Sequence, residues 1–225
     1  PLAKTGVSIP EVGMGTWNYR AGVGPLRDGL DAGAFFIDTA EAYDTETVVG
    51  QVVAGVRDRV FIATKVSPEH FGFDSVLKAA DGSLKRLGTD WIDLYQLHWP
   101  SDKVPIEETI AAMEQLVTAG KVRFIGVSNF SVAQLQRARD AASKYPIVSN
   151  QVCYNIVDRT IEGDLLEYRQ ENGITIIAYS PLVRDFQSLL ECDPNGALAE
   201  VARVTGKTIA QVAINWCLCR DGVVA

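Results

Sequence analysis

The chain has few cysteines and histidines, and no long hydrophobic run. Of its 225 residues, 4 are cysteine and 2 are histidine. Four cysteines are too few for a disulfide framework in a chain of this length, so we expect a cytoplasmic protein. No apolar run approaches the roughly 20 residues that a membrane-spanning helix needs. Residues 1–6 also lack the basic and then apolar layout of a signal peptide. We therefore expect no membrane partner.

No segment of the chain is strongly basic or strongly acidic. The 21 Lys and Arg residues and the 28 Asp and Glu residues give a net charge of −7. Because no basic cluster with interleaved aromatic residues occurs, we expect no nucleic-acid partner. Cys217 and Cys219 stand two apart in a predicted helix, where their side chains diverge by about 200°, so we expect no metal site there. The composition, 47% hydrophobic and 22% charged, is typical of a folded globular protein.

Short apolar runs rich in β-forming residues alternate with stretches of helical periodicity. The runs are nearly continuous rather than alternating, which is typical of strands buried on both faces. They cover residues 35–37, 60–63, 92–97, 122–127, 147–148 and 174–178. Helical spacing of apolar residues occurs over 106–117 and 209–216, and a further helix is predicted over 160–171, ended by Asn172-Gly173. This alternation predicts right-handed βαβ units around a parallel sheet.

The strand spacing favours a closed barrel over an open sheet. The predicted strands end at polar or aromatic residues roughly 20 to 33 residues apart, close to the length of one βα unit. These residues are Trp17, Asp38, Lys65, His98, Asn129, Gln151 and Tyr179. A doubly wound sheet would carry a phosphate loop, yet Gly13-Met14-Gly15 is followed by Asn18 where the third glycine should stand. We predict an α/β protein with a single (β/α)₈ TIM barrel domain over residues 1–225.

The sequence stops where the eighth strand of this barrel begins. The apolar run at residues 222–225 is the onset of that strand. A barrel ending at Ala225 would leave the eighth strand unpaired and the first strand with an open edge, which is costly. We therefore expect that most of the eighth strand and the C-terminal segment are missing from this sequence.

Three successive strand ends supply a carboxylate, an ammonium and an imidazole. These are Asp38, Lys65 and His98, and Tyr43 follows Asp38 by five residues. Barrel enzymes place their chemistry at the carboxyl ends of the strands, and neighbouring strands lie only about 4.8 Å apart. We therefore expect the four side chains to converge on one small volume.

This combination of groups suits proton transfer to a carbonyl oxygen. The Lys65 ammonium favours the phenolate of Tyr43, which would lower the tyrosine pKa. Asp38 keeps Lys65 charged, since an unpaired buried ammonium is costly. A neutral His98 can donate to a substrate oxygen and orient it. The pattern predicts Tyr43 as a general acid that needs no metal.

Several long motifs resemble the aldo-keto reductases. They are Gly-Met-Gly-Thr-Trp at 13–17, Asp-Thr-Ala-Glu-Ala-Tyr at 38–43, the segment 83–100 ending in Gln-Leu-His-Trp-Pro, Gly-Lys-Val-Arg-Phe-Ile-Gly-Val-Ser-Asn-Phe at 120–130 and Tyr-Ser-Pro-Leu at 179–182. The resemblance runs in order over essentially the whole chain. It implies a (β/α)₈ barrel that binds NADPH without a Rossmann fold and reduces an aldehyde or ketone. By the same resemblance Tyr43 is the general acid, Lys65 and Asp38 tune it, and His98 orients the carbonyl.

The resemblance also assigns the cofactor and substrate contacts. Ser128, Asn129 and Gln151 would hold the nicotinamide carboxamide, and Tyr179 would stack on the ring. The full set of implied cofactor contacts is Thr16, Trp17, Asp38, Ser128, Asn129, Gln151, Tyr179, Ser180 and Leu182. The implied substrate contacts are Trp17, Tyr43, His98 and Trp99.

The chain departs from the family pattern in two places. The loop after Leu182 reads Val-Arg-Asp-Phe-Gln at 183–187, without the glycine that the family commonly has there. The sequence therefore does not show whether this loop contacts the pyrophosphate. The family's basic segment for the adenosine 2′-phosphate would follow Ala225. NADPH is therefore the family expectation, and no residue present distinguishes it from NADH.

Two other functions use the same residues. Some family members are channel subunits that bind the nucleotide and keep the tetrad, so the four residues alone do not separate an enzyme from such a binding module. A barrel aldolase would use Lys65 as a Schiff-base nucleophile. That role needs a lysine that loses its proton, and Asp38 beside it favours the charged form. The sequence does not indicate the substrate or the oligomeric state.

Overall fold

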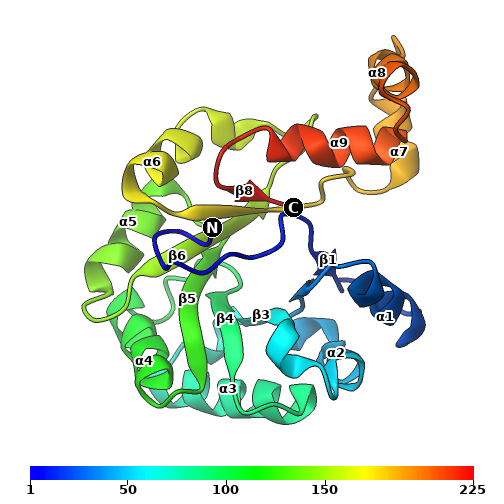
Figure 1. The fold of residues 1–225 in the computed structure, drawn as a ribbon. Coiled ribbons are helices and arrows are strands. Elements are labelled where there is room, and N and C mark those ends of the chain that lie inside the picture. The colour runs from blue at the N-terminus through cyan, green and yellow to red at the C-terminus, as the bar shows by residue number, and fades with distance from the viewer.

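Eight parallel strands in chain order form the centre of the structure, a computed structural model that describes residues 1–225 (Figure 1). Each strand pairs in parallel with the next one along the chain. The strands are β1 (Met14–Gly15), β2 (Phe36–Asp38), β3 (Phe61–Val66), β4 (Ile92–Leu97), β5 (Val122–Ser128), β6 (Ile147–Cys153), β7 (Thr175–Tyr179) and β8 (Val223–Val224). The predicted α/β TIM barrel, with a short eighth strand, is confirmed.

The eighth strand is paired, which corrects the expectation of an unpaired strand and an open edge. Val223 and Val224 pair with Ile176 and Ile177 of β7. On the other side, the Ala225 N–H donates to the Glu11 carbonyl at 2.8 Å, and the Gly13 N–H donates to the Ala225 carbonyl at 2.7 Å. These two bonds join the end of β8 to the segment before β1. Two strand residues and Ala225 are thus enough to bring the first and last strands together.

Helices cover the outside of the strands, as Figure 1 shows for α1 to α6. The α-helices are α1 (Gly24–Asp31), α2 (Glu46–Val53), α3 (Phe73–Leu87), α4 (Ile106–Thr118), α5 (Val132–Ala141), α6 (Leu165–Asn172), α7 (Phe186–Glu191), α8 (Ala197–Thr205) and α9 (Ile209–Leu218). Short 3₁₀ turns lie at η1 (Glu41–Tyr43), η2 (Arg57–Arg59), η3 (Pro68–His70) and η4 (Thr160–Glu162). Helix α4 and helix α9 match the predicted periodic stretches.

The helix predicted over residues 160–171 is split in two. Residues 160–162 form the turn η4, and α6 begins only at Leu165. Gly163 and Asp164 stand between them, and both residue types are poor in a helix interior. The predicted end is confirmed, because Gly173 takes the left-handed conformation at φ 64° after Asn172.

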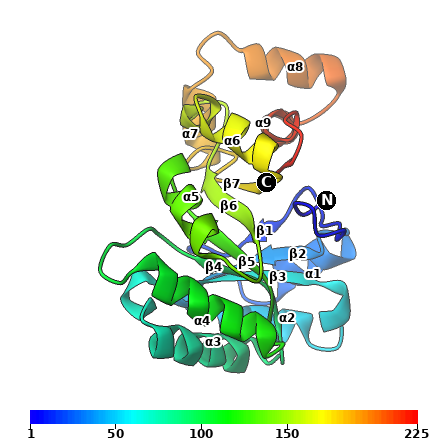
Figure 2. The same cartoon turned by 90° about the vertical axis from the view of Figure 1, so that its left-hand side faces the viewer.

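Three helices, α7 to α9, lie between β7 and β8. Figure 2 shows α8 standing away from the rest of the molecule. A small apolar cluster of Leu189, Leu198 and Ala213 holds the three helices together, and Leu182 packs against it. The segment after Leu182 therefore leads directly into α7, with the Asp185 side chain capping its first turn.

The hydrophobic core has two parts. The larger part lies between the strands and the surrounding helices. The smaller part fills the amino-terminal end of the strand ring, where Leu2 and Ile9 of the N-terminal segment pack with Phe36, Phe61 and Leu94. The N-terminal segment thus closes one end of the ring and leaves the carboxyl ends of the strands for a site. No helix combines the length and apolar character needed to cross a membrane.

A buried carboxylate ties three neighbouring strands together. Asp93 of β4 has a side chain only 2% exposed, and it accepts from Arg57 at 2.7 Å and from Arg123 of β5 at 2.7 Å. The same carboxylate accepts from the backbone N–H of Ile62 in β3 at 3.0 Å. Because all three donors face one buried group, its loss leaves the Arg57 guanidinium without its carboxylate partner and the Ile62 N–H without an acceptor.

We expect Asp93→Ala to destabilise the fold by about 3–5 kcal/mol, the usual cost of removing one partner of a buried ion pair. The matched control is Asp81→Ala, which removes an exposed carboxylate paired with Lys121. That change should cost at most about 1 kcal/mol, because exposed pairs contribute little. Urea unfolding of both variants measures the difference, and equal stabilities would contradict the role given to Asp93.

Candidate functional site

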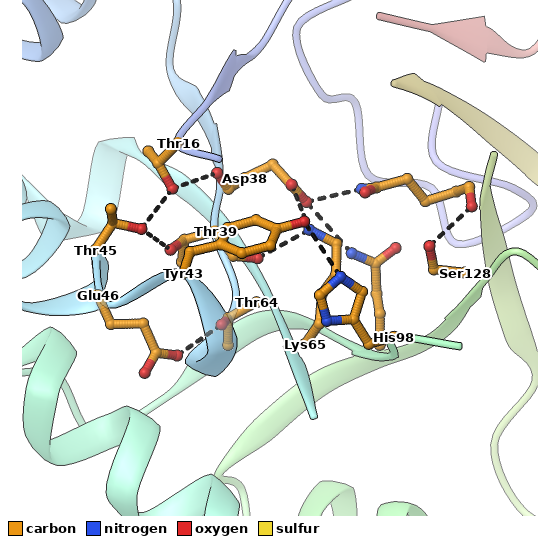
Figure 3. Close-up of polar contacts among 12 residues, drawn as sticks. Thr16, Asp38, Thr39, Tyr43, Thr45, Glu46, Thr64, Lys65, His98 and Ser128 are labelled. Carbon is orange, nitrogen blue, oxygen red and sulfur yellow. Dashed lines mark hydrogen bonds and ion pairs between the residues drawn. The ribbon is translucent and has the colours of Figure 1, made fainter. Parts of the chain in front are cut away.

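The four side chains expected to converge come from consecutive strand ends. Asp38 is the last residue of β2, Lys65 lies in β3, and His98 directly follows β4. Tyr43 ends the turn η1, which begins three residues after Asp38. The close-up shows the four groups meeting at one place (Figure 3).

The Lys65 ammonium is the centre of the arrangement. Its side chain is fully buried, and Nζ donates to Asp38 Oδ1 at 2.5 Å and to the Thr39 carbonyl at 2.9 Å. Its third contact is the hydroxyl of Tyr43 at 3.5 Å. The same hydroxyl lies 3.2 Å from Nε2 of His98. The phenol oxygen is therefore within hydrogen-bond reach of both nitrogens (Figure 3).

Two side-chain amides hold the second oxygen of Asp38. Gln151 of β6 donates to Oδ2 at 2.7 Å, and Gln96 of β4 approaches the same oxygen at 3.4 Å. Gln151 was predicted as a cofactor contact, whereas nothing in the sequence reasoning singled out Gln96. Its position was the available signal: Gln96 stands two residues before His98, and side chains two residues apart along a strand lie on the same side of the sheet.

A hydroxyl network supports the loop that carries Tyr43. The Thr45 hydroxyl lies 2.9 Å from those of Thr16 and Thr39, and the Thr16 hydroxyl also donates to the Asp38 carbonyl at 3.1 Å. Thr16 was predicted as a cofactor contact, and it is fully buried here behind Asp38. Thr39 and Thr45 were missed, because a threonine in a loop has no distinctive pattern in a single sequence.

The pKa of Tyr43 corrects the expectation from the sequence. Burial of the phenol raises its pKa well above the ordinary value, and the nearby Asp38 carboxylate raises it further. The expected lowering by the Lys65 ammonium is not found. Tyr43 is therefore a protonated phenol at neutral pH, which suits a proton donor.

Burial lowers the pKa of the two basic groups. The pKa of His98 falls to about 4 because the ring is desolvated and lies near the Lys65 charge. His98 is therefore a neutral imidazole at physiological pH, as expected. Burial also lowers the pKa of Lys65, and the ion pair with Asp38 offsets part of that effect.

The predicted carboxamide-binding residues form one connected group at the ends of β5, β6 and β7. The Ser128 hydroxyl donates to the Gln151 carbonyl at 2.9 Å. The Asn129 amide donates to the His98 carbonyl at 3.1 Å and to Ser128 at 3.0 Å, while the Tyr179 hydroxyl donates to Asn129 Oδ1 at 2.9 Å. The cap of α5 is Ser131, not Ser128 or Asn129. These side chains are thus oriented for the site by one another.

The remaining predicted contacts follow the carboxyl ends of β1, β4 and β7, which form the mouth of the barrel. Trp17 and Trp99 are 65% and 48% exposed, which is high for large aromatic side chains. The ring of Trp99 stacks on that of His98. Ser180 has a positive φ of 56°, and its carbonyl accepts from Asn155 at 3.1 Å. Leu182 is turned toward the α7–α9 cluster instead.

The family model described as the aldo/keto reductase family matches residues 11–225. The chain belongs to the aldo/keto reductase family. Among its relatives, methylglyoxal reductase YeaE of Escherichia coli is 38% identical, with 97% of this chain and 80% of the relative aligned. Glyoxal reductase of Bacillus subtilis is 36% identical, with 97% and 78% aligned.

Solved structures of aldo-keto reductases have the same fold. The thermostable aldo-keto reductase Tm1743 superposes with a TM-score of 0.91 at 40% identity, over 100% of this chain and 86% of that one. An aldo-keto reductase from Klebsiella pneumoniae in complex with NADPH gives a TM-score of 0.87 at 38% identity, over 96% and 80%. The resemblance stated from the motifs is confirmed.

One contact in this aldo-keto reductase was not anticipated from the sequence. His70 lies in the turn η3, and its Nδ1 is 3.0 Å from Glu41 Oε1. Glu41 also accepts from the Ser67 N–H at 2.6 Å. The turn that carries Tyr43 is thereby tied to the segment after β3.

We expect the ring protons of His98 to show no titration between about pH 5.5 and 8, because its pKa is lowered to about 4. Proton NMR of the two histidines measures this, and a His70→Gln variant assigns the signals. A transition of the His98 signal near the ordinary histidine pKa of about 6.5 would contradict the buried, neutral imidazole.

Proposed function

We propose that this aldo-keto reductase reduces aldehydes or ketones with NADPH, and that Tyr43 protonates the carbonyl oxygen. The observation that carries the proposal is the position of the Tyr43 hydroxyl, 3.2 Å from His98 and 3.5 Å from Lys65. A protonated phenol between an imidazole and an ammonium suits proton donation to an oxygen that gains charge. Residues 1–225 would act as one catalytic domain.

The nature of the relatives supports the cofactor and the substrate class. The Klebsiella structure contains NADPH, and the related reductases of E. coli and B. subtilis are named for methylglyoxal and glyoxal. We therefore propose NADPH as the reductant and small dicarbonyl aldehydes as good substrates. This choice goes beyond the aldehyde or ketone that the sequence motifs imply.

The groups present at the mouth are chemically suited to a nicotinamide. A carboxamide needs both donors and acceptors, and Ser128, Asn129 and Gln151 provide hydroxyl and amide groups of both kinds. Tyr179 offers an aromatic face next to Asn129, and the exposed Trp17 and Trp99 offer apolar surface for cofactor and substrate to cover. Ser180 would contribute from the loop after β7, and the buried Thr16 would support the site by holding the Asp38 carbonyl.

Each side chain of the site has a separate role in the proposed reduction. When bound, the reduced nicotinamide supplies the hydride to the carbonyl carbon. The neutral His98 donates to the carbonyl oxygen and orients it, with Trp99 at its side. Tyr43 gives its proton to that oxygen as negative charge develops. The Lys65 ammonium, held by Asp38, then stabilises the phenolate left on Tyr43.

We expect Tyr43→Phe to lower kcat for NADPH-dependent methylglyoxal reduction by about 10²–10⁴-fold, because the proton donor is lost. NADPH affinity should stay within about twofold. The control is Tyr145→Phe, a tyrosine before β6 whose hydroxyl contacts only Thr118. Unchanged turnover in Tyr43→Phe would contradict the proposal, and tight NADPH binding without turnover in the unmodified protein would favour a binding subunit.

We expect Tyr179→Phe to weaken NADPH binding by about 3–10-fold, since the hydroxyl that orients Asn129 is lost. The control is Tyr168→Phe, which removes a hydroxyl that accepts from Arg139 on the outer helices. Fluorescence titration with NADPH measures both. Equal affinities in the two variants would contradict the assignment of Tyr179 and Asn129 to the nicotinamide.

A further inference from the structure

Gln96 is a buried polar residue at the centre of the barrel. It is fully buried, and its neighbours in register are Lys65 of β3 and Gly126 of β5. Gly126 is in turn paired with Ser149 of β6. Gln96 therefore stands in one row of the strand ring with the lysine of the tetrad, and it has no exposed surface.

Its amide nitrogen and its amide oxygen meet different surroundings. The nitrogen approaches Asp38 Oδ2 at 3.4 Å, an oxygen that also accepts from Gln151 at 2.7 Å. The oxygen, Oε1, is buried and has no hydrogen-bond partner in the protein, and the same is true of the Ser149 hydroxyl. Buried polar atoms without partners are rare and destabilising, so Gln96 Oε1 and Ser149 Oγ both need an explanation.

Gly126 provides the space that these two side chains share. A Cβ atom at Gly126 would lie 2.4 Å from Ser149 Oγ and 3.1 Å from Gln96 Cγ. The side chains of Gln96 and Ser149 therefore fill the place where a side chain of residue 126 would begin.

Asp38 Oδ2 has two amide partners, Gln151 and Gln96, and they differ in their relation to the cofactor. Under the proposed function, Gln151 also contacts the nicotinamide carboxamide, so one side-chain amide serves both the cofactor and Asp38. Gln96 has no exposed surface and is not among the residues proposed to contact the cofactor. We propose that Gln96 is a positioning residue that keeps Asp38, and through it Lys65, in place when the cofactor engages Gln151.

The kinetic test compares Gln96→Met and Gln96→Glu with the unmodified protein. Methionine has nearly the same length and shape but cannot donate, so kcat should fall about 10-fold while KM and the NADPH Kd stay within twofold. Glutamate keeps the length but turns a carboxylate oxygen toward Asp38, so kcat should fall further. Active sites are counted by NADPH titration, so loss of folded protein does not lower kcat.

The matched control is Tyr95→Phe. Tyr95 is the neighbour of Gln96 on the opposite face of β4, and its buried hydroxyl also has no hydrogen-bond partner. This variant changes a buried polar atom of the same strand and should leave kcat unchanged. Gln96 variants with the kcat of the unmodified protein, or a Tyr95→Phe variant with the same loss, would overturn the proposal.

Crystal structures give a readout that does not depend on turnover. In the unmodified protein with NADP⁺ bound, we expect the Gln96 nitrogen within about 3.2 Å of Asp38 Oδ2. In Gln96→Met, the Asp38 carboxylate should rotate. An unmoved Asp38 would overturn the proposal even if the variants cannot be assayed. Absence of any carbonyl reduction by the unmodified protein would instead count against the proposed function.

Discussion

The buried ion pair between Lys65 and Asp38 is the interaction on which the site depends. A fully buried ammonium is costly unless each of its donors has an acceptor, and Lys65 has three: Asp38, the Thr39 carbonyl and the Tyr43 hydroxyl. Satisfying this charge fixes the end of β2 against β3 and draws Tyr43 toward them. The geometry that suits proton transfer is therefore also the geometry that makes the buried charge tolerable.

The barrel remains stable with such a buried charge because its other parts are firmly joined. The N-terminal segment fills one end of the ring with Leu2 and Ile9, and Asp93 ties β3, β4 and β5 together near that same end. Hydrogen bonds of Ala225 to Glu11 and Gly13 bring the last strand to the first. The opposite end is left free for polar groups and for the exposed Trp17 and Trp99.

Much of the fold and the identity of the four central residues could be predicted because the signals are local. Nearly continuous apolar runs mark buried parallel strands, and a polar residue directly after each run marks the strand end. The predictions failed where the outcome depends on distant parts of the chain. The pairing of β8, the raised pKa of Tyr43 and the position of Gln96 beside Asp38 all depend on neighbours from other strands.

The sequence by itself determined the order of strands and helices, the positions of Asp38, Lys65 and His98 at three successive strand ends, and the family, because these follow from periodicity and from unbroken motifs. The tertiary structure decided the electrostatics. Burial and the charge of Asp38 raise the pKa of Tyr43, and desolvation keeps His98 neutral. Such effects arise only when the ring of strands removes these groups from water together.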